Sequence, residues 1–261
     1  MGLPIMGTVL RDKGYSIKIF CSDITPIDWT EVLSADLVML STITSTATET
    51  YQIARKIKEK AKVLGRDIPI VMGGAHVTFM ADEALEHHAD FVVRGEGEET
   101  ILELLSWLES GNDPNVISQI KGLSYKIGNR VHHNEKRSPF MDQDSLPTPD
   151  LSLIQGWKNP SIIPVITSRG CPFDCTFCSV TKIFGHRYRT RSPEKVIEDI
   201  KYYRRLYPHS WVFFYDDNFS ADKKRTKSVL ELMLENDLHI SWTAQSRLDV
   251  VKDKELLHLM R

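Results

Sequence analysis

The sequence predicts an α/β protein made of two domains, each with a largely parallel sheet. Short apolar runs alternate with amphipathic helical stretches in both halves of the chain. Glycine or polar residues follow several of the apolar runs, as they do at the carboxyl ends of parallel strands. A proline-rich segment over residues 138–160 separates the halves. We therefore expect domains over 1–112 and 161–261, joined by a β-hairpin and connector over 113–160.

Composition narrows the classes of protein that fit. The chain has 261 residues, of which 41% are hydrophobic and 26% charged, with a net charge of −2. That charge argues against a surface built to neutralise nucleic-acid phosphates. No apolar run approaches the roughly 18 residues of a membrane span, and no charged leader precedes an apolar core. We expect a cytoplasmic protein in a reducing interior, with the lone Cys21 filling core space.

In the first half, apolar runs predict strands over 16–21, 36–41, 68–72 and 90–94. Between the second and third runs lies the clearest helix, which opens on the capping-box pattern of Thr46 and Glu49. This alternation predicts a doubly wound, Rossmann-like domain. The chain opens on a helical stretch over 3–13, so we expect the domain to lack its first, central strand.

Polar and glycine residues follow the predicted strands of this domain and should meet at one edge of its sheet. The candidate binding residues of this edge are Ser41, Thr42, Ile43, Gly73, Gly74 and His76. A glycine pair directly after a strand lets the backbone approach a ligand or another helix closely. A loop histidine more often bonds a neighbouring carbonyl than a metal, so metal ligation by His76 is the weaker interpretation.

The rest of the chain continues the strand and helix alternation. Residues 122–126 and 130–133 predict a β-hairpin. Strands are then expected over 163–167, 211–215 and 240–244, with helices over 192–203, 222–234 and from 252. Parallel strands alternating with helices are the building units of a β/α barrel.

The most informative motif is a loop with three cysteines, Cys171, Cys175 and Cys178, spaced C-x3-C-x2-C. Three thiolates without an obvious fourth suggest a metal centre with an open position. One alternative is a Cys3His zinc site with His186 as its fourth ligand. A disulfide pairing is weaker still, because three clustered cysteines cannot all pair.

This spacing, with the aromatic Phe177 before the last cysteine, resembles the signature of the radical S-adenosylmethionine (SAM) superfamily. The resemblance implies a partial (β/α)6 barrel, of which this chain holds about the first half. It also implies that Cys171, Cys175 and Cys178 bind a [4Fe-4S] cluster. In the family the cluster's free iron chelates SAM, and one electron cleaves SAM to a 5'-deoxyadenosyl radical. Phe177 would lie near the SAM adenine.

Two further loops would complete the SAM site by resemblance to the family. Where the family often has G-G-E-P, this chain has Asp216, Asp217 and Asn218 before Phe219. By resemblance, Asp216 or Asp217 would receive the methionine amino group of SAM, although the motif differs from the family's here. An ordinary turn after a strand explains these residues equally well. Gln245 and Arg247 follow the next strand, where relatives contact the SAM ribose or carboxylate; surface solvation is the alternative for Arg247.

The first half resembles the cobalamin (B12)-binding domain that precedes the radical SAM domain in a large class of enzymes. Ser41, Thr42 and Ile43 stand where that fold has its S-x-L segment, and Gly73 and Gly74 where it has its GG. Both segments line the nucleotide tail of the corrin in relatives. The family's D-x-H-x-x-G loop would place its histidine just before Met1, so the axial ligation of cobalt is not readable from this chain.

Together these resemblances imply a cobalamin-dependent radical SAM enzyme, most simply a methyltransferase acting on an unactivated carbon of a small molecule. A reduced ferredoxin or flavodoxin is the expected electron donor. Two alternatives remain: a cyclase or rearrangement enzyme with the same cofactors, and a catalytically incomplete fragment that only binds cofactor. The sequence does not identify the substrate.

Overall fold

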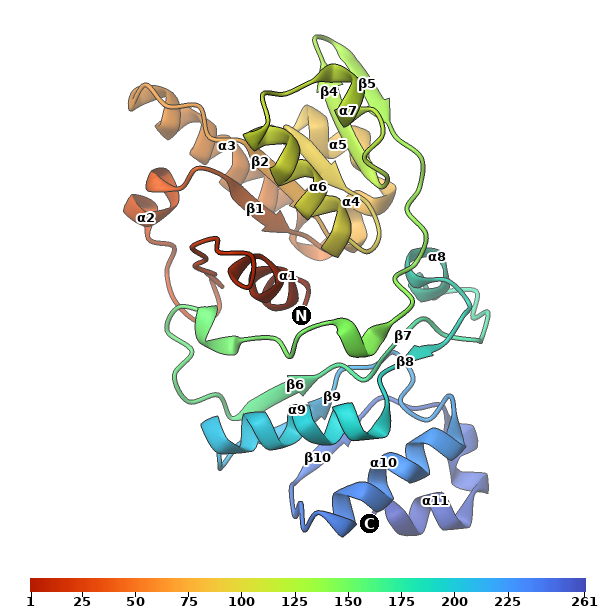
Figure 1. The fold of residues 1–261 in the computed structure, drawn as a ribbon. Helices are drawn as coiled ribbons and strands as arrows, with labels where there is room; N and C mark the ends of the chain where they lie inside the picture. Colours follow the sequence, from red (N-terminus) through yellow and green to blue (C-terminus); the bar gives the residue numbers. More distant parts are fainter. The chain divides into compact units, whose positions relative to one another are not determined.

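The computed structural model describes residues 1–261 and divides into two compact units (Figure 1). The first unit comprises residues 2–139 and 149–156. The second comprises Met1, residues 140–148 and residues 157–261. The predicted connector is thus shared between the units, since its hairpin belongs to the first and residues 140–148 to the second.

The first unit contains one five-stranded sheet with strand order β1-β2-β3-β4-β5. Its strands β1 (Val38–Ser41), β2 (Ile70–Gly73) and β3 (Phe91–Val93) are parallel. The hairpin of β4 (Leu123–Ile127) and β5 (Arg130–His133) continues this sheet in antiparallel register. The predicted hairpin is therefore confirmed and adds two strands to the sheet.

Helices cover both faces of this sheet, as a doubly wound fold requires (Figure 1). Along β2, Ile70 and Met72 pack with α3 and α5, whereas Val71 between them packs with α1 and α6. Successive side chains of a strand point to opposite faces, and both faces here are apolar because both are covered. The helices are α1 (Gly2–Arg11), α2 (Trp29–Ser34), α3 (Ala47–Val63), α4 (Ala75–Phe79), α5 (Ala81–Glu86), α6 (Glu98–Glu109) and α7 (Pro114–Ile117), with 3-10 turns η1 (Thr44–Thr46) and η3 (Leu151–Leu153).

Two local expectations are wrong. The stretch 16–21 forms no strand of the sheet; it makes a single bridge between Ile19 and Ile154, in which Ile19 donates to Leu153 O and accepts from Gln155. Ile19 is buried and Ile17 is half-buried, and both lie against Gly7 of α1, so these apolar residues are covered without joining a sheet. Thr46 caps α3 without a side-chain bond to the helix, because its hydroxyl is used by the backbone of Ile43. Cys21 is half-buried.

The second unit contains a parallel sheet with order β10-β9-β6, formed by β6 (Ile162–Val165), β9 (Trp211–Phe214) and β10 (Trp242–Ala244). Helices α9 (Pro193–Leu206) and α10 (Lys223–Glu235) connect these strands. This is the predicted first part of a β/α barrel. The remaining elements are the ribbon of β7 (Ser168–Arg169) and β8 (Arg189–Thr190), the 3-10 turns η2 (Gln143–Ser145) and η4 (Leu248–Lys252), and the helices α8 (Val180–Phe184) and α11 (Lys254–Leu259).

None of the helices has both the length and the apolar character needed to cross a membrane.

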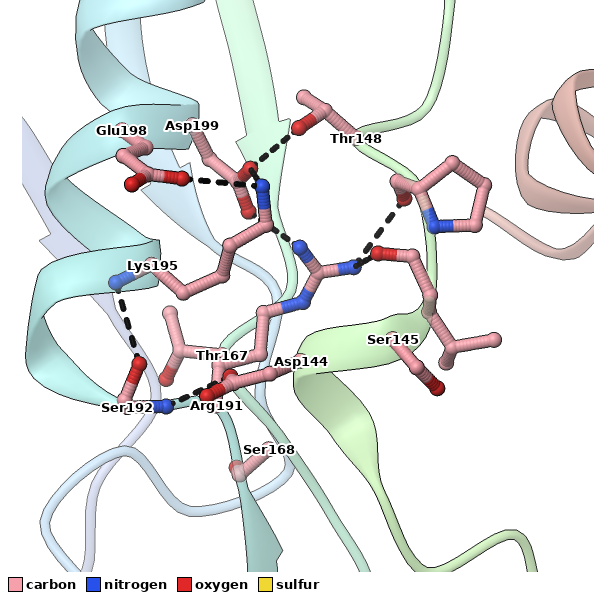
Figure 2. A network of polar contacts seen from close by, with 12 residues as sticks. Asp144, Ser145, Thr148, Thr167, Ser168, Arg191, Ser192, Lys195, Glu198 and Asp199 are labelled. Carbon is pink, nitrogen blue, oxygen red and sulfur yellow. Dashed lines mark hydrogen bonds and ion pairs between the residues drawn. The ribbon is translucent and has the colours of Figure 1, made fainter.

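A buried polar network fixes residues 140–148 within the second unit (Figure 2). Arg191 forms a 2.5 Å ion pair with Asp199 of α9, and both side chains are almost fully buried. The same guanidinium donates to the carbonyls of Leu146 and Pro147, each at 3.1 Å, while Thr148 donates to Asp199. Two buried charges are therefore satisfied by each other and by the proline-rich segment, which explains why that segment is ordered without being helix or strand.

Replacement of Asp199 by Asn should lower the free energy of unfolding by about 3 kcal/mol, because it leaves the buried Arg191 without its counter-charge. The neighbouring Glu198→Gln is the matched control, since the Glu198–Lys195 pair is exposed and contributes less than about 0.5 kcal/mol. Urea unfolding of both variants measures the difference. Equal losses would contradict a buried role for this ion pair.

Candidate functional site

The three cysteines lie on the loop between β7 and α8, at the carboxyl end of the second unit's sheet. All three are free thiols and half-buried. The loop turns between Cys175 and Cys178, whose backbones are joined by a 3.0 Å hydrogen bond. Gly170 precedes Cys171 with φ at +83°, and a Cβ there would collide with the carbonyl of Arg187. The chain therefore enters the cysteine loop through a position that only glycine fits.

A positively charged side chain lies beside one of the three cysteine sulfurs. Arg247, three residues after the end of β10, donates to Cys175 Sγ at 3.6 Å and stacks over the Phe173 ring at 4.0 Å. Arg247 therefore brings a positive charge next to one of the three cysteine sulfurs. Phe177, 90% exposed, presents an open aromatic face one residue before Cys178.

The sulfurs fit an iron-sulfur cluster in donor chemistry. Three thiols on one loop match the requirement of a cluster that keeps one iron free, because each thiol ligates a different iron. His186, the fourth ligand of the zinc alternative, is exposed. The structure gathers no three His, Cys, Asp or Glu side chains around a single point.

The Asp216 carboxylate, expected to face SAM, is buried and already bonded. Its Oδ1 accepts from the amides of Thr167 at 2.7 Å and Ser168 at 2.8 Å, and its Oδ2 accepts from the Thr167 hydroxyl. Burial raises the pKa of Asp216, while these hydrogen bonds act in the opposite direction. Asp216 thus holds the chain just before the cysteine loop.

Its neighbours at the end of β9 differ in exposure. Asp217 is exposed, and its partial desolvation, with the nearby Asp216 charge, raises its pKa. Asn218 is buried, and its carbonyl accepts from the Tyr188 hydroxyl at 3.1 Å. Gln245 and Arg247 are exposed after β10, and the Gln245 carbonyl accepts from Phe219 at 2.9 Å. The predicted loops after β6, β9 and β10 therefore do meet at one rim.

Sequence reasoning missed the residues that support this rim: Thr167, Tyr188 and Arg225. Thr167 and Arg225 are nine-tenths or more buried, and burial raises the pKa of Tyr188 to about 12. Nothing in the local sequence marks them, because their partners lie far along the chain. The position of Arg225 in the first turn of a predicted helix does not distinguish it, because arginines there are also common on solvated faces.

In the first unit, the loops after β1 and β2 are held together as expected. Ser41 pairs with Gly73 in the parallel register, Thr42 donates to Gly73 O at 3.0 Å, and His76 donates its amide to Thr42 O at 3.3 Å. Gly74 has φ at +103°, and a Cβ there would lie 2.5 Å from Thr42 O. Ile43 is apolar and 55% exposed beside this backbone. The rim therefore presents backbone and a small apolar surface.

The His76 side chain is engaged inside the first unit. Its Nδ1 lies 3.3 Å from Thr44 Oγ1, and its Nε2 lies 3.1 Å from the Tyr51 hydroxyl and 3.6 Å from Glu83. Both ring nitrogens thus have partners in α3, α5 and the loop after β1. This arrangement fixes the loop and leaves neither nitrogen open for metal ligation.

Comparison with known proteins agrees with both resemblances. Residues 1–105 match the B12 binding domain model, and residues 165–261 match the radical SAM superfamily model. The chain is 34% identical to "Uncharacterized methyltransferase PH0819" of Pyrococcus horikoshii over 97% of its length and 56% of the relative. It is 33% identical to the anaerobic magnesium-protoporphyrin IX monomethyl ester cyclase of Cereibacter sphaeroides, over 88% of this chain and 38% of that protein.

Among solved structures, the radical SAM methyltransferase TsrM from Kitasatospora setae superposes with a TM-score of 0.72 at 17% identity, over 99% of this chain and 50% of TsrM. The cobalamin-dependent SAM radical enzyme OxsB gives a TM-score of 0.72 at 19% identity, over 88% of this chain and 34% of OxsB. These likenesses confirm the fold of both units. The chain spans about half the length of the relatives it matches, or less.

Gly74→Ala should destabilise the first unit by about 3 kcal/mol, because a Cβ both strains the backbone and collides with Thr42 O. Gly65→Ala is the matched control: Gly65 also has a positive φ, but nothing lies within 4 Å of its Cβ position, so about 1 kcal/mol is expected. Urea unfolding measures both. Equal losses would show that the close approach to Thr42 does not constrain position 74.

Proposed function

Because the chain belongs to the proteins that combine a B12-binding domain with a radical SAM domain, we propose that it is a cobalamin-dependent radical SAM enzyme that methylates an unactivated carbon. The observation that carries the proposal is the three-thiol loop at the carboxyl rim of a parallel sheet, with Phe177 and Arg247 beside it. A second glycine-lined rim in the same chain supports the cobalamin part.

Cys171, Cys175 and Cys178 would hold the [4Fe-4S] cluster. When bound, the cluster supplies the electron that cleaves SAM, and cobalamin supplies the methyl group. Arg247 donates to Cys175 Sγ and would balance the negative charge of a bound cluster.

The SAM nucleotide and amino acid would lie over the same rim. Phe177 offers the adenine a stacking face, since almost all of its ring is exposed. Of the two aspartates, Asp217 is the better partner for the methionine amino group, because both oxygens of Asp216 are bonded to Thr167 and Ser168. Gln245 and Arg247 are positioned to receive the ribose or the carboxylate. The Asn218 side chain is buried, so this residue would support the shape of the loop and not contact SAM directly.

The cobalamin tail would lie along Ser41, Thr42, Ile43, Gly73 and Gly74. Their backbones are joined across β1 and β2, and the glycine pair leaves no side chain to obstruct a ligand. His76 supports this rim by tying the loop after β1 to α3.

The proposed partners follow from this chemistry. We propose a small-molecule substrate and a reduced ferredoxin or flavodoxin as electron donor, in a reducing cytoplasm. Nucleic acid is not proposed as a partner, given the net charge of −2.

Ring closure is the second candidate function, because a relative at 33% identity is named as a cyclase. It uses the same cofactor residues, so the reaction products separate it from methyl transfer. S-adenosylhomocysteine formed together with 5'-deoxyadenosine favours methyl transfer, whereas 5'-deoxyadenosine alone favours cyclisation.

Anaerobic reconstitution of the chain with iron and sulfide, followed by SAM and a reductant, tests the proposal. We expect one [4Fe-4S] cluster per chain and formation of 5'-deoxyadenosine. The Cys171→Ala, Cys175→Ala and Cys178→Ala variants should each lose most of the cluster, whereas Cys21→Ala, the matched control outside the loop, should retain it. Iron uptake without 5'-deoxyadenosine supports a fragment that only binds cofactor, and a colourless protein that holds zinc overturns the proposal.

Asp217→Asn should weaken SAM binding about tenfold, because it removes a charged acceptor for the amino group while the cluster stays intact. Asp237→Asn, an exposed aspartate on the turn after α10, is the control and should bind SAM as the unaltered chain does. Equilibrium dialysis of SAM against the reconstituted proteins measures the effect. Unchanged binding by Asp217→Asn would remove this residue from the proposed SAM site.

A further inference from the structure

The segment that carries the three cysteines begins after Thr167 and ends before Arg191, and we call these two residues its neck. We propose that Arg225 is a positioning residue that joins the two residues of the neck and thereby sets the orientation of the iron-sulfur cluster toward SAM. This inference rests on the proposed function, since it assigns a role in the same site to a residue that touches no cofactor.

One guanidinium joins the two ends of the neck. Arg225 Nη2 donates to Thr167 O and to Arg191 O, both at 3.1 Å, and its Nε donates to Arg191 O at 3.3 Å. The ends also bond to each other, because the Arg191 amide donates to Thr167 O at 2.9 Å. The segment that carries all three cysteines is therefore pinned at both ends by a side chain of α10, the helix of the following β/α unit.

The same guanidinium is linked to Asp216 through a hydroxyl. Arg225 Nη1 donates to Thr167 Oγ1 at 2.8 Å, and that hydroxyl donates to Asp216 Oδ2. Because the hydroxyl accepts from a cation and donates to a carboxylate, the two buried charges fix its direction. Asp216 also holds the amides of Thr167 and Ser168, so the first residues of the loop have little freedom.

Burial makes this network more than a surface contact. Thr167, Asp216 and Arg225 are each nine-tenths or more buried, so water cannot replace a lost partner. After the neck, the short β7–β8 ribbon leads to Gly170 and Cys171. A rotation at Thr167 is therefore transmitted through few flexible positions to the first cysteine, and small displacements of reacting groups strongly affect rate.

Arg225→Lys tests the role. Lysine keeps the buried positive charge, but one ammonium cannot serve Thr167 Oγ1 and both carbonyls with a guanidinium's planar geometry. Thr167→Val is the second variant, which loses the hydroxyl with little change in shape. Ser210→Ala is the matched control: it removes a buried hydroxyl bond to Pro160 O at the amino end of the same sheet, remote from the cysteine loop.

Each protein is checked for folding by circular dichroism and urea unfolding, then reconstituted anaerobically. We expect Arg225→Lys and Thr167→Val to take up iron as the unaltered chain does. Their reduced clusters should give altered electron paramagnetic resonance spectra, with the change on SAM addition reduced, and the apparent Kd for SAM should rise about tenfold. Ser210→Ala should lose stability without either change.

The outcomes separate the two proposals. If the unaltered chain takes up no [4Fe-4S] cluster, the proposed function fails, and this inference fails with it. If it does take up the cluster, but both variants lose only stability, as Ser210→Ala does, with unaltered spectra and SAM binding, the network is merely structural and this inference alone is overturned. If Arg225→Lys does not fold, Thr167→Val decides by the same criteria.

Discussion

The second unit depends on a buried guanidinium that holds together two points far apart along the chain. Arg225 joins Thr167 to Arg191, and Asp216 holds the amides of Thr167 and Ser168. Buried charges are stable only when their hydrogen-bonding groups are all used, which makes this arrangement geometrically demanding. It lies directly before the loop that carries the sulfurs. The loop itself has little secondary structure, so its conformation depends on contacts of its two ends with the sheet and with α10.

In both units, a glycine with positive φ lies near the carboxyl edge of the parallel strands. Gly74 directly follows β2 in the first unit, and Gly170 directly follows β7, the short strand that comes after β6, in the second. At each glycine a neighbouring carbonyl occupies the space of a Cβ. Close backbone approach lets the loops pack against one another while leaving their outer surface to a ligand.

Relatives named as methyltransferases and as cyclases each match most of this chain, over 97% and 88% of its length. The relatives are also roughly twice as long as the part matched here, or longer. We therefore assign none of the residues at these strand ends to the choice between methyl transfer and ring closure.

The sequence by itself determined the two α/β units, the hairpin and the cysteine loop. These depend on local periodicity, glycine positions and a short motif, which are readable along the chain. Tertiary structure decided the rest. The stretch 16–21 became a single bridge because its partner, Ile154, lies in the connector. Asp216 is buried and Arg247 contacts Cys175 because their partners also lie far away along the chain. A polar side chain's role is set by the donors and charges that folding brings beside it, and those partners have no signal at neighbouring sequence positions.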